Sequence, residues 1–542
     1  MTSRRVRSHR RGLRPTQWLM IAIAISTLTS AAILALPRPQ AASAQADGTT
    51  AGLPRVSPGV VAPPVVVDEA AAPWHQPGWI AAENALPGTT DWHIADDRAA
   101  WEKIRGYAWA TSVDVGETVN LSVEAPGGRW RADAYRMGYY GGAGARLVWR
   151  SEDQEPVDQP DPVTDYLSGA LEAQWSPSLT VSTDSWPPGM YLFKLTSDDG
   201  GATFVPLVVR DDVSTSDLLF QSAVTTWQAY NGWGGGSHYT GPGGTAEGRA
   251  SVISFDRPYT GNGSGEFLGR EFELIYFMER LGLDVSYWTD IDLHERGELA
   301  RNHRAVVIGG HDEYYTTAMR RHLEDARDAG VNIAFFGANN VYRKIRLDDG
   351  PNGTSRRQTN FRSTSDPMMA YDESEVTVEW RVDPSNEPES TLTGSYYECN
   401  PVEADMVIFD PDSWIFAGTG VEQGTRWDDV VGNEYDRVTP AAPTPASIQV
   451  LAHSPVTCKG KSSYADMTYY TTSSGAGVFD AATFWLIPPL DDACEPGSQS
   501  CQIQQMAENI LRAFAAGPAG QAHPSEPNLD DLGITLQDPT YP

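Results

Sequence analysis

A dense group of polar residues, His311-Asp312-Glu313-Tyr314-Tyr315, directly follows the apolar run 305–308 and two glycines. A short apolar run that ends in glycines predicts a buried strand, and ligands of open α/β sheets bind beyond the carboxyl ends of such strands. His311 and Glu313 therefore lie where catalytic or metal-binding side chains are expected. The alternative is that Asp312 or Glu313 only caps the helix that follows.

Two other predicted strands are also followed by candidate donors. Tyr230 follows the strand predicted at 218–220, and Asn339 follows the strand predicted at 331–336. The carboxyl ends of parallel strands meet at one edge of a sheet, so Tyr230, Glu313 and Asn339 are expected to converge. The alternatives are a packed, hydrogen-bonded phenol for Tyr230 and a turn residue for Asn339.

Phenolate and carboxylate oxygens are hard anionic ligands, which favour a strongly Lewis-acidic ion such as iron(III). Such an ion could polarise an amide carbonyl and lower the pKa of bound water without a protein nucleophile. The sequence has no G-x-S-x-G motif and no cysteine in the region where strands and helices alternate, which disfavours serine hydrolases and thiol amidases. The glycine-rich segment 232–236 lacks the ending of a phosphate-binding loop.

The chain of 542 residues has a formal net charge of −31 at pH 7, which disfavours nucleic acids and anionic membrane surfaces as partners. Residues 1–44 differ from the rest, because several arginines precede the uncharged run 18–36 and the small residues Ala42-Ser43-Ala44. This pattern predicts a secretory signal peptide, with a retained N-terminal membrane anchor as the alternative. We expect a secreted or extracytoplasmic protein whose only membrane contact would be that anchor.

The four cysteines all lie late in the chain, and an even number in an exported protein predicts disulfides. The short spacing between Cys494 and Cys501 suggests that these two pair with each other, which leaves Cys399 to pair with Cys458. None of the spacings is that of a zinc finger, so structural zinc is not expected.

The chain is predicted to have several domains. Residues 45–89 are rich in Pro and Ala and predict an extended linker, and 518–542 predict a mobile tail. Short alternating runs separated by turn residues predict a β-sandwich over 90–212. Alternating strands and helices predict a Rossmann-like, or glutamine-amidotransferase-like, α/β domain with a mostly parallel sheet over 213–517. Its clearest strands are expected at 218–220, 284–288, 305–309 and 331–336, and its helices at 265–281, 292–300, 316–329 and 500–515.

Five segments occur in an order that resembles a known family. They are Tyr135 to Gly142 (YRMGYYGG), Thr226 to Asn231 (TWQAYN), Ser254 to Tyr259 (SFDRPY), Gly310 to Tyr314 (GHDEY) and Phe335 to Asn340 (FFGANN). Together they resemble the C-terminal region of the large (beta) subunit of N,N-dimethylformamidase, over roughly residues 100–515.

The resemblance implies a mononuclear iron, held by two tyrosines and one glutamate, that activates water to hydrolyse a small N-alkylated formamide. Carried over by motif, Glu313 and Tyr230 would be two of the ligands. The second tyrosine would be Tyr191, with Tyr139 and Tyr140 as nearby competitors.

The resemblance also implies roles for three other residues. His311 would contact the ligands or transfer protons, and Asn339 would donate a hydrogen bond to the substrate carbonyl. Glu434 would match a further carboxylate that serves as general base.

The sequence departs from the family in its leader and in the segment 478–485. The characterised enzyme is intracellular and has a small partner subunit, so a similar subunit or a homo-oligomer is the expected partner here, with a small amide as substrate. We expect an exported amide hydrolase. The alternative is a non-catalytic surface protein that binds carbohydrate or protein through its many aromatic side chains.

Overall fold

A computed structural model describes residues 72–241 and 243–536. The predicted leader at 1–44 and most of the predicted linker lie outside the described residues. The last part of that linker contains helix α1 (Trp79–Asn84), which buries Trp79 and Ile80. None of the helices in the described part of the chain is long and apolar enough to cross a membrane.

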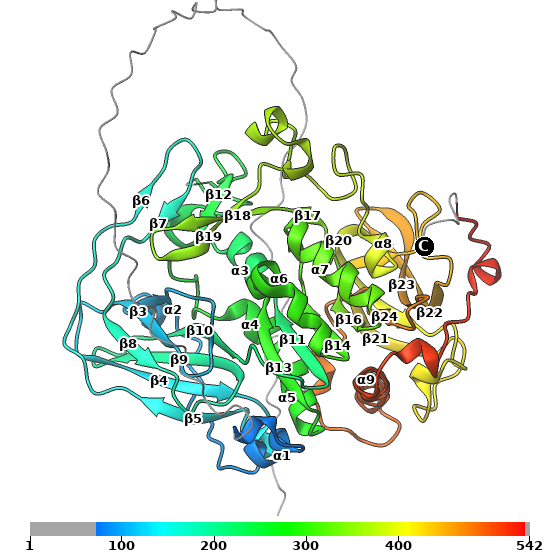
Figure 1. Cartoon of the computed structure of the whole chain (residues 1–542), viewed down its shortest axis with the longest axis horizontal. Helices are drawn as coiled ribbons and strands as arrows, with labels where there is room; N and C mark the ends of the chain where they lie inside the picture. Colours follow the sequence, from blue (N-terminus) through cyan, green and yellow to red (C-terminus); the bar gives the residue numbers. More distant parts are fainter. Residues whose placement is uncertain (1–71, 242, 537–542) are drawn as a thin grey trace, which may run out of the picture. The chain divides into compact units, whose positions relative to one another are not determined.

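The first part of the fold consists of two sheets that share a core (Figure 1). One sheet contains, in order, β1 (Arg105–Ala108), β3 (Thr118–Glu124) and β8 (Leu179–Ser182). The other contains β2 (Ser112–Asp114), β10 (Ala202–Arg210), β9 (Gly189–Ser197), β4 (Trp130–Met137) and β5 (Ala145–Arg150). Successive side chains of β9 point to opposite faces of its sheet. Phe193 and Leu195 therefore enter this shared core, whereas Met190 and Leu192 pack against the rest of the protein.

The largest sheet has seven strands. Its order is β13 (Val285–Thr289), β11 (Leu218–Ser222), β14 (Ala305–Gly310), β16 (Asn332–Gly337), β24 (Gly477–Asp480), β23 (Lys461–Thr471) and β22 (Gln449–Cys458). The first five strands pair in parallel, and the last two join as antiparallel strands. All five parallel strands are buried along their whole length, as expected for strands covered on both faces.

Helices cover both faces of this sheet. Phe220 and Phe336 pack in one cluster with residues of α5 (Phe272–Arg280) and α9 (Gln499–Ala516). Their neighbours along the strands, including Phe335, face the opposite way and pack with α7 (Thr317–Asp328). The alternation along each strand thus produces two separate cores.

The remaining helices and strands are short or lie in small sheets. The helices are α2 (Arg98–Trp101), α3 (Val224–Tyr230), α4 (Gly265–Arg270), α6 (Asp290–Arg296) and α8 (Ser390–Thr393). The strands are β6 (Val163–Thr164), β7 (Leu171–Glu172), β12 (Val252–Ser254), β15 (Tyr314–Tyr315), β17 (Arg343–Lys344), β18 (Arg346–Gly350), β19 (Gly353–Thr359), β20 (Tyr396–Val407) and β21 (Arg426–Arg437).

The prediction of a Rossmann-like α/β domain with a mostly parallel sheet is wrong. The parallel pattern that is clear at 217–337 does not continue, because much of the chain from 346 to 471 forms the antiparallel hairpins β18–β19, β20–β21 and β22–β23. The strands are consequently divided among a mixed seven-stranded sheet and several small sheets. The prediction was wrong because it extended the alternation of strands and helices at 217–337 to the later part of the chain, where it assigned no hairpins.

Single elements of that region were predicted more closely. The expected helix at 316–329 is α7, and the one at 500–515 is α9. The helix expected at 265–281 is divided into α4 and α5 at Glu271, whose buried carboxylate accepts hydrogen bonds from the backbone N–H of Ala223 and from Trp227 Nε1. Both predicted disulfides, Cys399–Cys458 and Cys494–Cys501, are confirmed.

A buried ion pair joins the first part of the fold to the α/β part. Arg136 on β4 donates from both terminal nitrogens to the carboxylate of Glu279 on α5, at 2.6 and 3.0 Å, and both side chains are fully buried. Tyr287 on β13 and Asn84 at the end of α1 also donate to this carboxylate. One charged pair therefore fixes four elements to one another.

Replacing Arg136 with Met should lower the free energy of unfolding by about 3–5 kcal/mol, because Glu279 would remain as an unpaired buried charge. Urea unfolding measures the change. The double variant Arg136→Met/Glu279→Leu should recover part of the loss, since it leaves no buried charge. Arg98→Met, at an exposed ion pair with Glu102, is the control and should change stability by less than about 1 kcal/mol. A loss for Arg136→Met as small as that of the control would contradict the prediction.

Candidate active site

The candidate site lies where the parallel strands β11, β14 and β16 end (Figure 1). His311 and Glu313 directly follow β14, and Asn339 follows β16. Tyr230 is the last residue of α3, the helix that follows β11. The three loops come together because parallel strands present their carboxyl ends at the same edge of the sheet.

The acidic residues after β14 do not cap the next helix. The N-cap of α7 is Thr316, whose Oγ1 accepts the backbone N–H of Met319 at 3.1 Å. Asp312 instead accepts hydrogen bonds from Gln221 Nε2 and the Tyr315 hydroxyl, both at 2.7 Å. The capping alternative for this motif is therefore excluded.

Three oxygens form a compact cluster at this edge. The Oε2 of Glu313 accepts hydrogen bonds from the hydroxyls of Tyr230 at 2.9 Å and Tyr239 at 2.8 Å. The two phenol oxygens are themselves 2.8 Å apart, and the two rings stack with their centroids 4.3 Å apart. We call Tyr230, Tyr239 and Glu313 the oxygen triad.

Tyr239 is the member that the sequence analysis missed. It reaches the triad because the glycine-rich segment 232–236 folds the chain back, with Gly234 and Gly235 at positive φ. Arg257 fixes this turn by donating to the carbonyl oxygens of Asn231 and Gly236 at 2.9 and 2.8 Å. The glycine run was visible in the sequence, but nothing there indicated which tyrosine it would deliver.

Tyr191, predicted as the second tyrosine ligand, lies elsewhere. Its ring stacks on Trp186 inside the shared core of the two N-terminal sheets, and its hydroxyl donates to the carbonyl oxygen of Pro187 at 2.7 Å. Alternation along β9 places Tyr191 on the same face as Phe193, so it points into that core. No described interaction joins Tyr191 to Tyr230 or Glu313.

The two competing tyrosines are also outside the site. The Tyr140 hydroxyl donates to Glu83 at 2.7 Å and accepts from Arg136 at 2.9 Å, and the Tyr139 ring packs against Tyr276. This segment of the sequence therefore belongs to the network around the buried Arg136–Glu279 pair.

Glu313 is held as a carboxylate by its surroundings. Burial alone would raise its pKa, but His311 at 3.5 Å, together with the positive charges of Arg343 and Arg362, lowers the pKa of Glu313 to about 2. The Nε of Arg343 is 3.4 Å from Oε1, and the Arg362 guanidinium lies over the Tyr239 ring at 4.1 Å. A buried anion is thus present at neutral pH.

The oxygen triad has the donor chemistry of a site for a hard cation. Burial and the charge of Glu313 raise the pKa of both Tyr230 and Tyr239, so the phenols keep their protons unless a cation offsets the negative charge. The oxygens of the triad are 2.8–2.9 Å apart. Within the described residues, His, Cys, Asp and Glu side chains form no metal-binding group of three or more, so a metal here depends on the phenols.

Three further polar side chains surround the triad. His311 Nε2 lies 3.4 Å from Asn339 Nδ2 and 4.0 Å from Glu434 Oε2. Burial lowers the pKa of His311, but its contact with Glu313 and the charge of Glu434 outweigh burial and leave the pKa raised. For the carboxyl group of Glu434, burial has the opposite effect and raises the pKa, although the charge of His311 opposes this rise. The structure therefore brings together five of the six site residues predicted from the sequence.

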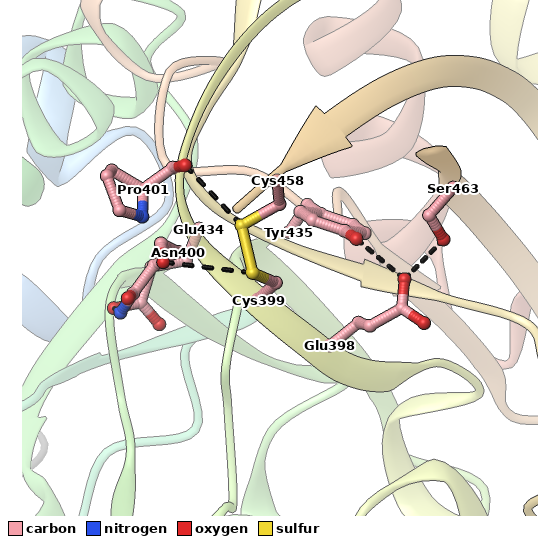
Figure 2. Close-up of a disulfide and its surroundings, with 8 residues drawn as sticks. All are labelled: Glu398, Cys399, Asn400, Pro401, Glu434, Tyr435, Cys458 and Ser463. Carbon is pink, nitrogen blue, oxygen red and sulfur yellow. Dashed lines mark hydrogen bonds between the residues drawn. A yellow bond between two sulfur atoms is a disulfide. The ribbon is translucent and has the colours of Figure 1, made fainter. Parts of the chain in front are cut away.

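Asn400, a residue that the sequence analysis did not select, orients Glu434. Its Nδ2 donates to Glu434 Oε1 at 2.7 Å, whereas the buried Oε2 has no hydrogen-bond partner in the described protein. Asn400 follows Cys399, whose disulfide to Cys458 ties β20 to the end of β22 (Figure 2). The disulfide thus anchors the backbone that presents Asn400 to the carboxylate.

A comparison with curated proteins found no significant match. Residues 131–499 match the family described as N,N-dimethylformamidase beta subunit-like, C-terminal. This range includes every residue of the oxygen triad together with His311, Asn339 and Glu434. The resemblance found in the sequence is confirmed, and the chain belongs to the N,N-dimethylformamidase beta subunit-like family.

Proposed function

We propose that this chain is an exported hydrolase that uses a mononuclear iron ion to cleave the C–N bond of a small amide. The observation that carries the proposal is the oxygen triad, which contacts His311 next to a second buried carboxylate, Glu434. Membership of the family supports a formamidase-like hydrolase. We further propose that the hydrolase binds iron and that it is exported from the cytoplasm. The two disulfides are consistent with export.

Tyr230, Tyr239 and Glu313 would hold the ion. We place the second phenolate at Tyr239 rather than Tyr191, because only Tyr239 shares Glu313 Oε2 with Tyr230. When bound, iron(III) would supply Lewis acidity, which polarises a carbonyl group and lowers the pKa of water.

The protein groups around the triad supply the proton transfers. Asn339 Nδ2 would donate a hydrogen bond to the substrate carbonyl oxygen. Glu434 Oε2 has no hydrogen-bond partner in the described protein and lies 4.0 Å from His311 Nε2. It would accept a proton from the attacking water, and the raised pKa of Glu434 suits a general base. His311, whose pKa is also raised, would give a proton to the departing nitrogen. Water and amide thereby become a carboxylic acid and an amine.

Iron content and colour test the proposal. The full chain, expressed with iron and purified after export, should contain about one iron and absorb visible light through tyrosinate-to-iron charge transfer. Tyr239→Phe should lose most of the colour and weaken iron binding at least tenfold, because it removes one of three protein ligands. Metal analysis and the visible spectrum measure both effects.

Tyr191→Phe is the matched control for that experiment. It also removes one buried tyrosine hydroxyl, but at a site outside the triad, so iron and colour should be retained. Loss of colour in Tyr191→Phe with retention in Tyr239→Phe would contradict our ligand assignment. A colourless, iron-free wild-type protein would contradict the iron-dependent function and favour the non-catalytic binding hypothesis.

Asn400→Ala tests the role of Glu434 as base. The hydrogen bond from Asn400 lowers the pKa of Glu434, so its loss should raise that pKa and move the acidic limb of the pH profile of kcat/KM to higher pH. We expect kcat to fall about tenfold near neutral pH, with KM little changed. Ser463→Ala is the control, because Ser463 contacts Glu398 on the other side of the disulfide (Figure 2). An unchanged pH profile in Asn400→Ala would contradict this role.

A further inference from the structure

A chain of hydrogen bonds leads from Arg362 to the oxygen triad. Arg362 Nη2 donates to the hydroxyl of Tyr314 at 2.8 Å, and this hydroxyl donates to the Tyr239 oxygen, also at 2.8 Å. Tyr239 in turn donates to Glu313 Oε2 at 2.8 Å. Tyr314 and Arg362 are not members of the triad, but they are connected to it without a break.

We infer that Tyr314 and Arg362 are positioning residues for the metal site. They hold the Tyr239 oxygen at the ion and hydrogen-bond it there, which sets how strongly Tyr239 donates electrons to the iron. The inference rests on the proposed function, because it concerns the same triad with its ion bound. Arg362 acts through Tyr314, and Tyr314 acts on Tyr239.

The two ends of the chain fix the direction of every hydrogen bond in it. A guanidinium group can only donate hydrogen bonds, and an ionised carboxylate can only accept them. The hydroxyl of Tyr314 must accept from Arg362, so its own hydrogen is free to point at Tyr239. When Tyr239 binds an ion as a phenolate, this donor is therefore already directed at the phenolate oxygen.

The position of the Tyr314 hydroxyl is fixed by packing. Tyr314 is fully buried, and its ring stacks on His238 with the centroids 5.9 Å apart. Its backbone carbonyl accepts a hydrogen bond from Thr225 Oγ1 at 2.9 Å, and it lies opposite Arg343 in the pairing of β15 with β17. Because both the ring and the backbone of Tyr314 are held, its hydroxyl is held relative to Tyr239.

Arg362 brings a positive charge that no carboxylate of the described residues neutralises within 4 Å. Its neighbour Arg343 pairs with Glu379 at 3.0 Å, whereas the Arg362 guanidinium lies over the Tyr239 ring at 4.1 Å. Acidic residues outnumber basic ones by 71 to 40 in this chain, so a shortage of carboxylates does not explain the missing partner. A cation over an aromatic ring is attracted to its electron-rich face, and a phenolate adds a full negative charge. The partner that suits Arg362 is thus Tyr239 in its ion-bound form.

Groups that hydrogen-bond to a metal ligand change the electronic properties of the metal. A hydrogen bond to a phenolate oxygen lowers the energy of the electrons that the oxygen shares with iron. Charge transfer to iron(III) then needs light of shorter wavelength, and the weaker donation favours iron(II) and raises the reduction potential. Loss of the hydrogen bond should reverse both effects.

The variant Tyr314→Phe tests the inference, because it removes the hydroxyl and keeps the ring. In the iron-loaded full-length protein, the tyrosinate-to-iron band should move to longer wavelength and the reduction potential should fall. Iron binding should weaken about 10- to 100-fold, as is typical when a group that orients a metal ligand is lost. The visible spectrum, a redox titration and competition with a chelator measure these changes, and thermal unfolding checks that the variant is folded.

Two variants of Arg362 test the other end of the chain. Arg362→Met removes both the donor to Tyr314 and the positive charge, so the band and the potential should change in the same direction as in Tyr314→Phe. Arg362→Lys keeps the positive charge and should restore part of the change. Values for Arg362→Met equal to those of the wild type would overturn the role of Arg362.

Tyr470→Phe is the matched control. The hydroxyl of Tyr470 also accepts a hydrogen bond from an arginine, Arg327 Nη1 at 3.4 Å, but it donates to the carbonyl oxygen of Leu392 at 2.6 Å. This arrangement has no contact with the triad, so iron content, band and potential should stay as in the wild type. A shift in Tyr470→Phe as large as that in Tyr314→Phe would overturn the inference.

None of these measurements requires catalysis, which separates the inference from the proposed function. An unchanged band and potential in iron-loaded Tyr314→Phe would overturn the inference and leave the iron-dependent function standing. The expected shifts without hydrolysis of any amide would support the inference and contradict the hydrolase function. A wild type that takes up no iron(III), even when iron is added to the purified protein, would overturn both.

Discussion

The burial of the Glu313 carboxylate is the constraint on which the site depends. An isolated carboxylate at 2% exposure would be costly, so neighbouring segments must supply compensating groups. Two phenols and one imidazole lie against it, and two guanidinium groups add positive charge. These groups come from α3, from the loop after it, from the end of β14 and from the segments around β17 and β19. One anion thus couples the folding of several separate segments.

Two nearby carboxylates, Glu313 and Glu434, have opposite environments. Positive groups keep the pKa of Glu313 low, whereas burial keeps that of Glu434 raised. Separating the pKa values of two nearby carboxyl groups is a general way to assign one to charge stabilisation and the other to proton transfer. Here the two come from different kinds of structure, because Glu313 follows a parallel strand and Glu434 lies on an antiparallel hairpin. The disulfide at Cys399 stabilises that hairpin region, where the parallel pattern has ended.

The family motifs fall into two groups in the structure. Residues 310–314 and 226–231 carry Glu313 and Tyr230 of the candidate site, and Arg257, in the segment 254–259, holds the turn that delivers Tyr239. The segment 135–142 lies apart from these side chains and builds the network around the Arg136–Glu279 pair. Some shared motifs therefore lie at the candidate site, and others hold parts of the fold together. A tyrosine within a motif is thus not necessarily a candidate metal ligand.

The sequence by itself determined the local features: the strand ends that carry His311, Glu313 and Asn339, the long helices α7 and α9, and both disulfide pairs. These follow from short-range patterns of apolar spacing, glycines and cysteine separation. The tertiary structure alone decided that Tyr239 rather than Tyr191 meets Glu313, and that the hairpins after β17 make the sheet mixed. Both outcomes depend on contacts between residues far apart in sequence, whose register and direction no local pattern specifies.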